Sequence, residues 1–136
     1  MITDDRELKQ ILTSVKTVAS VGVSSNEEKP SYWIFLYLLD HGYHMIPVNP
    51  TATQIHGQKV HPDLASISEK VDVVQVFRKP EDVLPVVDDA IRIGAKVVWM
   101  QEGVINEEAA RKAEAAGLKV VMNRCMMKTH DRLIGG

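Results

Sequence analysis

The sequence predicts an α/β fold: a doubly wound, mostly parallel sheet of five to six strands with helices on both faces, in three layers. Short apolar segments alternate with longer helical patterns along the chain, which is typical of parallel βαβ units with right-handed crossovers. The apolar segments are hydrophobic on both sides, as strands covered on both faces require. No internal repeat or linker interrupts the pattern, so we expect a single domain over residues 1–136.

Hydrophobic periodicity and end signals assign each element a place in this alternation. A first amphipathic helix is expected directly after Thr3, its N-cap. Strands are expected over Val18–Val23, His44–Val48, Val71–Phe77, Ala95–Met100 and Leu118–Met122, with a short strand at Val60. Helices are expected over Ser31–His41 and Pro80–Ile93, between Asn106 and Gly117, and for one turn near Leu64. Residues 126–136 are compatible with a short helix, a lid or a disordered tail.

The expected helix over residues 31–41 is almost wholly apolar, since it contains the run WIFLYLL. A helix that is hydrophobic on all sides is normally buried. We therefore expect its aromatic side chains to lie in the core rather than against a ligand, with Tyr32 at an exposed mouth as the exception.

Composition narrows the classes of function. The net charge is −2, with 16 basic and 18 acidic residues, so no global positive field favours binding to nucleic acid. No apolar run approaches the ~20 residues needed to span a bilayer, and the polar N-terminal segment does not resemble a secretory signal. The single cysteine, Cys125, excludes an internal disulfide. These features predict a cytoplasmic protein that binds neither membrane nor nucleic acid.

Polar segments follow the predicted strands and should converge, because ligands of open α/β sheets bind beyond the carboxyl ends of the strands. The first strand is followed by a turn, and the helix after it begins with Pro30 and Ser31. The turn and the later strand ends supply these candidates: Gly22, Val23, Ser24, Ser25 and Asn26; Asn49 and Pro50; Phe77, Arg78 and Lys79; Gln101, Glu102 and Gly103; Asn123, Arg124 and Cys125.

Residues 18–31, VASVGVSSNEEKPS, form the end of a predicted strand, a turn and the start of a helix. This arrangement favours a phosphate-bearing ligand, because a helix N-terminus offers unpaired N–H groups to an anion. An ordinary turn capped by Ser31 is the alternative. The dinucleotide fingerprint G-x-G-x-x-G is broken here to GVSSNE, and Asn49 stands where an NAD site has an acid for the ribose hydroxyls. Both departures argue against NAD. They are compatible with a phosphorylated ribose, whose charge could be met by Arg78, Lys79, Lys59 or Lys29.

The sequence contains no recognisable catalytic or metal-binding constellation. None of the five histidines forms a ligand-spaced pair, so we expect no metal site. Neither a G-x-S-x-G elbow nor a Walker A loop is present. Cys125 is the only candidate thiol nucleophile, and Arg124, Lys128 and His130 could favour its thiolate. Most single cysteines, however, are inert core residues.

Several strings, taken together, resemble a known family. They are VGVSSNEEKPSYWI, YLLDHGYHMIPVNP, HGQKV, VDVVQVFRKPE, IGAKVVWMQEGVINEEAA and AGLKVVMNRC, and they cover the chain from about Val18 to Cys125. The chain resembles the small stand-alone CoA-binding proteins, whose Rossmann-type domain also forms the nucleotide-binding part of the succinyl-CoA synthetase α subunit. The specific combination is VNP after the second strand, WMQEG after the fifth and NRC after the last.

The resemblance implies a Rossmann-like fold and coenzyme A as the ligand. It implies that the turn 22–26 holds the diphosphate and that Phe77 to Lys79 border the adenosine. It further implies that Gln101, Glu102 and Gly103 line the path of the pantetheine arm, with Asn123 and Cys125 further along. The phosphohistidine of succinyl-CoA synthetase lies in a second domain that this chain lacks, so ligase activity does not follow.

The leading hypothesis is therefore binding of CoA or an acyl-CoA at the strand ends, without catalysis by the protein itself. One alternative is an NAD(P)-dependent oxidoreductase. Another is a thiol-redox or acyl-transfer protein that uses Cys125. The expected partner is a small molecule, and a homodimer or a partner enzyme is compatible with the sequence.

Overall fold

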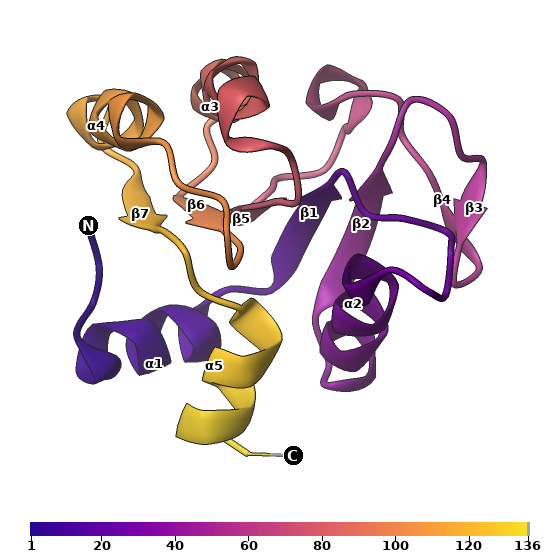
Figure 1. The fold of residues 1–136 in the computed structure, drawn as a ribbon, viewed down its shortest axis with the longest axis horizontal. Coiled ribbons are helices and arrows are strands. Elements are labelled where there is room, and N and C mark those ends of the chain that lie inside the picture. The colour runs from indigo at the N-terminus through magenta and orange to yellow at the C-terminus, as the bar shows by residue number, and fades with distance from the viewer. Residues whose placement is uncertain (136) are drawn as a thin grey trace.

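Five parallel strands form the central sheet of the computed structural model, which describes residues 1–135. Their order is β2-β1-β5-β6-β7 (Figure 1). The chain first winds from β1 outward to β2, then crosses back to β5 on the other side of β1. The strand order therefore reverses between β1 and β5, which is the position where open α/β sheets bind their ligands. The strands are Thr17–Val21 (β1), His44–Val48 (β2), Val73–Val76 (β5), Val97–Met100 (β6) and Lys119–Val121 (β7).

Helices cover both faces of the sheet, which confirms the predicted three-layer α/β fold (Figure 1). One face carries α1 (Asp5–Ser14), α2 (Pro30–Asp40) and α5 (Met126–Leu133). The other carries α3 (Val83–Arg92) and α4 (Glu107–Ala115). Each face has its own hydrophobic core, one that includes Phe35 and Trp99 and another that includes Val74 and Met100. None of the helices described is long and apolar enough to cross a membrane.

A small hairpin lies beside the sheet and was not predicted. Strands β3 (Gln54–Ile55) and β4 (Gln58–Lys59) pair antiparallel around His56 and Gly57, whose φ angles are 50° and 76°. Two successive positive φ angles are typical of the tight turns that join hairpins. The short strand expected at Val60 ends one residue earlier, since β4 covers Gln58–Lys59, and His61 forms an isolated parallel bridge to Val48 of β2. The turn expected near Leu64 is present as a 3₁₀ helix over Leu64–Ser66.

Other boundaries differ from the prediction for local reasons. Asp4, not Thr3, caps α1, since its carboxylate accepts from the Arg6 N–H. The segment after Lys79 first forms a 3₁₀ turn, Pro80–Asp82, before α3 begins. Asn106 caps α4 as expected, and most of the unassigned tail forms α5.

Strand β1 ends at Val21 because the chain turns at Gly22, where φ is +87°. A Cβ on Gly22 would lie 2.7 Å from the carbonyl oxygen of Phe77, the residue that follows β5. Glycine is thus required at this position both by backbone conformation and by close contact. The contact allows the exits of β1 and β5 to approach each other at the switch point.

We predict that Gly22→Ala lowers the free energy of unfolding by about 1–3 kcal/mol, because it combines backbone strain with a clash against a carbonyl. Gly94→Ala is the matched control, since Gly94 has φ +75° but a Cβ there would meet no atom within 4 Å. Denaturant unfolding of both variants measures the difference. Equal losses in the two variants would contradict the importance of the Phe77 contact.

Candidate functional site

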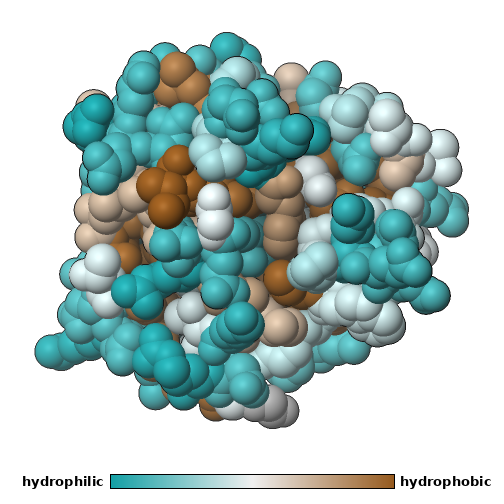
Figure 2. Space-filling view, viewed as in Figure 1, coloured by the Kyte–Doolittle hydropathy of each residue, from teal (hydrophilic) through white to brown (hydrophobic). Residues whose placement is uncertain are grey.

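A cavity of about 830 Å³ opens at the carboxyl edge of the sheet, at the switch point between β1 and β5. It is lined by the turn after β1, the segment after β5 and the segment after β6. The first turns of α2 and α5 complete its walls. Figure 2 shows hydrophobic residues near the middle of the molecule with hydrophilic residues around them. The cavity has a comparable mixture, since cationic side chains and apolar core residues both line it.

The structure brings most of the residues singled out from the sequence to this cavity. Those from the first turn and from α2 are Gly22, Ser24, Pro30 and Ser31. Those from the later strand ends are Phe77, Arg78 and Lys79, then Gln101, Glu102 and Gly103, and finally Cys125. The remaining candidates lie outside the lining: Val23, Ser25, Asn26, Asn49, Pro50, Asn123 and Arg124.

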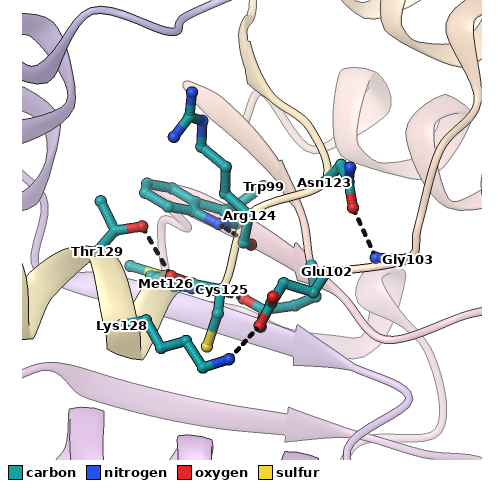
Figure 3. Close-up of polar contacts among 10 residues, drawn as sticks. Trp99, Glu102, Gly103, Asn123, Arg124, Cys125, Met126, Lys128 and Thr129 are labelled. Atoms are coloured by element: carbon teal, nitrogen blue, oxygen red, sulfur yellow. Dashed lines mark hydrogen bonds and ion pairs between the residues drawn. The ribbon is translucent and has the colours of Figure 1, made fainter.

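Two of these outlying candidates, Asn49 and Asn123, hold neighbouring loops together. Asn49 Nδ2 donates to the Val23 carbonyl at 2.9 Å, which ties the loop after β2 to the turn after β1. Asn123 Oδ1 accepts from the Gly103 N–H at 2.8 Å, which ties the end of β7 to the segment after β6 (Figure 3). Asn123 adopts a positive φ of 60°, which asparagine tolerates better than most residues. Both side chains therefore shape the edge of the sheet from outside the cavity.

Positive charge is concentrated in the cavity. Lys29, Arg78, Lys79 and Lys128 line it, whereas Glu102 is the only carboxylate in the lining. Glu102 pairs with Lys128 at 2.9 Å (Figure 3), and no carboxylate within residues 1–135 forms an ion pair with the other three cations. This local excess is hidden in the sequence by the net charge of −2. Of the four basic residues considered for a ribose phosphate, only Lys59, on β4, lies elsewhere.

The turn after β1 is held by its own hydrogen bonds. The Ser24 N–H donates to Ser31 Oγ at 2.9 Å, and the Asn26 N–H donates to Ser24 Oγ at 3.0 Å. Each hydroxyl oxygen is thus occupied as an acceptor, while neither hydroxyl donates to any of residues 1–135. Ser24 and Ser31 both line the cavity, so their hydroxyl hydrogens are available to a ligand. The turn can therefore contact an anion through hydroxyl groups.

A buried chain of polar side chains runs beneath the cavity. Ser20 Oγ donates to Gln75 Oε1 at 2.9 Å, and Gln75 Nε2 donates to Gln101 Oε1 at 3.2 Å. The N–H of Met126 donates to the same Gln101 oxygen at 3.0 Å. All three side chains are buried, yet each finds a partner, as buried polar groups require. This chain connects β1, β5, the end of β6 and the start of α5.

Cys125 lies at the start of α5, immediately before its first residue, Met126. It is buried and lines the cavity together with Met127 and Lys128. Figure 3 shows its thiol on the same side as the ion pair between Lys128 and Glu102. That ion pair raises the pKa of Lys128, mainly through the hydrogen bond to Glu102, so the ammonium stays charged. The segment is further fixed by the Trp99 indole, which donates to the Arg124 carbonyl at 2.9 Å.

The aromatic residues of α2 do not all lie in the core, and for Trp33 the prediction is wrong. Phe35 is fully buried, but the Trp33 side chain is 51% exposed and lines the cavity. Its indole N–H donates to the Glu27 carbonyl at 2.7 Å, which holds the ring over the first turn. Tyr32, expected at the mouth, lies outside the lining and packs against His56, with 3.9 Å between the ring centroids and 42° between the ring planes.

Sequence reasoning did not single out every apolar residue of the lining as a site residue. The residues it missed are Trp33, Ile34, Val104 and Met127. A 3.6-residue period from Pro30 would have placed Ile34 beside Pro30 and Ser31 on one face of α2. Met127 could be found only once the tail was known to form a helix against the sheet.

Helix α5 packs against α2 through a buried imidazole. The Tyr37 hydroxyl and His130 Nδ1 form a hydrogen bond of 2.9 Å, and His41 Nδ1 donates to the Tyr37 carbonyl at 2.6 Å. The centroids of the His41 and Tyr43 rings lie 5.1 Å and 5.8 Å from that of His130. Burial, and secondarily the nearby His41, lower the pKa of His130, while Asp131 acts in the opposite direction. His130 lies outside the cavity lining and serves as a structural contact of α5.

Comparison with known proteins identifies the family. The family model described as a CoA binding domain matches residues 16–131. This chain belongs to the CoA-binding domain family. One relative of this CoA-binding domain is the uncharacterized protein YneT of Bacillus subtilis, which is 36% identical over 124 residues, covering 91% of this chain and 92% of YneT.

Solved structures place this CoA-binding domain among both stand-alone proteins and larger enzymes. A hypothetical protein from Pyrococcus horikoshii is 44% identical with a TM-score of 0.95, covering 98% of this chain and 94% of that one. The dinucleotide-forming acetyl-coenzyme A synthetase 1 of Candidatus Korarchaeum cryptofilum is 29% identical with a TM-score of 0.71. The match covers 79% of this chain but only 26% of the synthetase. The same fold thus forms part of a much longer enzyme chain.

We predict that acid weakens this CoA-binding domain partly through His130. Because the folded state lowers the pKa of His130, the unfolded chain takes up the proton more readily. The contribution of neutral His130 to the free energy of unfolding is complete at pH values above its unfolded-state pKa of about 6.5. This contribution is lost as the pH falls below that value and through the lower pKa of the folded state. His130→Gln should therefore show a smaller loss of unfolding free energy than the parent as pH falls from about 6.5.

Denaturant unfolding at a series of pH values measures this effect. His44→Gln is the control, because His44 is exposed at the start of β2 and is not one of the rings packed around His130. The same pH dependence in the parent and in His130→Gln would show that His130 does not contribute.

Proposed function

We propose that this protein binds coenzyme A or an acyl-CoA in the cavity at the switch point. The observation that carries the proposal is the concentration of cations there. Three of the cationic side chains, Lys29, Arg78 and Lys79, have no carboxylate partner within residues 1–135, although the whole chain has a net charge of −2. Unpaired cations around a concave site favour a polyanionic ligand. CoA carries a diphosphate and a ribose phosphate, so its head group matches this charge.

The pantetheine half of CoA matches the apolar part of the cavity lining. Ile34, Cys125 and Met127 belong to or pack against the core on the α2 and α5 face, and all three reach the cavity. A pantetheine arm is long and largely apolar, with amide groups along it. We therefore infer that the arm extends from the cationic side of the cavity toward this apolar margin, past Gln101 and Gly103.

The diphosphate is assigned to the turn after β1. Hydroxyl hydrogens of Ser24 and Ser31 are available there, and the N-terminus of α2 contributes the positive end of its dipole. Arg78 and Lys79 approach from the segment after β5 and supply charge for the phosphorylated ribose.

Isothermal titration of ligand-free protein with CoA, acetyl-CoA and NAD tests the proposal. We expect binding of a CoA species and weaker or absent binding of NAD, because no acid follows β2 to hold an unmodified ribose. Absence of binding by both CoA and acetyl-CoA would refute the proposal. Tighter binding of NAD than of CoA would favour an oxidoreductase instead.

We predict that Arg78→Gln raises the Kd for CoA roughly tenfold or more, since a charge-assisted hydrogen bond contributes about 1.5 kcal/mol or more. The salt dependence of binding should also become less steep. Arg111→Gln is the control, because it removes the same charge from an exposed position on α4 outside the cavity. Equal affinities of the two variants would contradict the assigned role of Arg78.

A further inference from the structure

The Gln101 amide presents an unused hydrogen-bond donor to the cavity. Its oxygen already accepts from Gln75 Nε2 and from the Met126 N–H, which fixes which end of the amide faces the protein. Its nitrogen donates to none of residues 1–135, although the residue is only 3% exposed. Because Gln101 lines the cavity, the available N–H₂ group points to the ligand space. No buried side-chain nitrogen or oxygen within residues 1–135 lacks a hydrogen-bond partner, so this unpaired donor is open to the cavity, where a ligand can accept from it.

Cys125 lines the same cavity as this donor. Gln101 binds the N–H of Met126, the residue directly after Cys125, so the amide and the thiol share one wall of the cavity. Cys125 also precedes the first residue of α5, where the helix dipole is positive. The Lys128 ammonium lies nearby, held in place by Glu102 (Figure 3). Developing negative charge on a bound ligand would therefore meet a hydrogen-bond donor and positive potential.

We propose that Gln101 and Cys125 form an acyl-transfer site, which rests on the proposed binding of acyl-CoA. Gln101 Nε2 donates to the carbonyl oxygen of the ligand's thioester. The Cys125 sulfur attacks the carbonyl carbon, a new thioester to Cys125 forms, and the bond from that carbon to the CoA sulfur breaks. The proton of the Cys125 thiol passes to the departing CoA thiolate. The products are acylated Cys125 and free CoA, with no oxidant or reductant required.

The Gln101 donor distinguishes this activity from a redox role. A thioester carbonyl oxygen is a good hydrogen-bond acceptor, whereas the sulfur atoms of a CoA disulfide are weak ones. At the reacting end of a CoA disulfide the Gln101 amide would meet only weak acceptors, whereas a thioester offers it a carbonyl oxygen. The orientation of that amide, fixed by the Met126 N–H that donates to its oxygen, therefore favours a thioester at this point of the cavity.

The experiment begins with titration of the parent protein, so that failure to bind is recognised before acylation is measured. The parent, Cys125→Ser and Gln101→Glu are then incubated with acetyl-CoA and followed by intact-mass and peptide mass spectrometry. Gln101→Glu keeps an oxygen for Gln75 and Met126 but removes the donor. Circular dichroism and CoA titration of this variant verify that it folds and binds.

We expect an acetyl group on Cys125 of the parent, removable by hydroxylamine, with release of free CoA. Cys125→Ser should carry none, and both Gln101→Glu and urea-denatured parent should react at least tenfold more slowly. A parent that binds acetyl-CoA but stays unmodified would overturn the proposal, as would equal rates in the parent and Gln101→Glu or in native and denatured protein. Adducts formed only with CoA disulfide would overturn it in favour of thiol exchange. No binding of any CoA species would refute the proposed function itself.

Discussion

The close contact between Gly22 and the Phe77 carbonyl is the constraint on which the site depends. A side chain at position 22 would place an atom 2.7 Å from that oxygen, so the exits of β1 and β5 could not approach as they do. Their approach places the turn that leads to α2 beside the segment that carries Arg78 and Lys79. Without it, the hydroxyl groups of one loop and the cations of the other would not face the same space. Of the three glycines of the G-x-G-x-x-G fingerprint, the chain thus retains only Gly22, which this contact requires.

Beneath this contact, a buried chain of polar side chains links the sheet to α5. The chain from Ser20 through Gln75 to Gln101 crosses three neighbouring strands and ends at the start of α5. It fixes the orientation of the Gln101 amide and fastens the helix that carries Cys125 to the sheet. On the far end of the same helix, His130 is fastened to α2 through Tyr37. The cavity wall formed by α5 is therefore held at both ends, which pre-organises it for a ligand.

The sequence predicted the fold well because its strands are short apolar segments covered on both faces, a pattern visible locally. It also predicted that polar strand ends would meet, since parallel strands share one carboxyl edge. Gln75 could not be recognised, because its partners Ser20 and Gln101 lie 55 and 26 residues away. Trp33 was placed in the core because hydrophobicity alone does not show which side of α2 faces the sheet. Lys29, Arg78 and Lys79 are candidates from the sequence, but the total charge did not show that they converge, because acidic residues elsewhere balance them.

Amide hydrogen exchange with and without CoA tests most directly whether the switch-point cavity is the binding site. We expect CoA to slow exchange in residues 22–34, 77–80, 101–104 and the first turn of α5, because these four segments contain the residues that line the cavity. A second groove, of about 530 Å³, lies at the opposite edge of the sheet near Ser14, Lys96 and Gly117 and should show no change. Protection confined to that second groove, or unchanged exchange throughout the cavity at saturating CoA, would contradict the account.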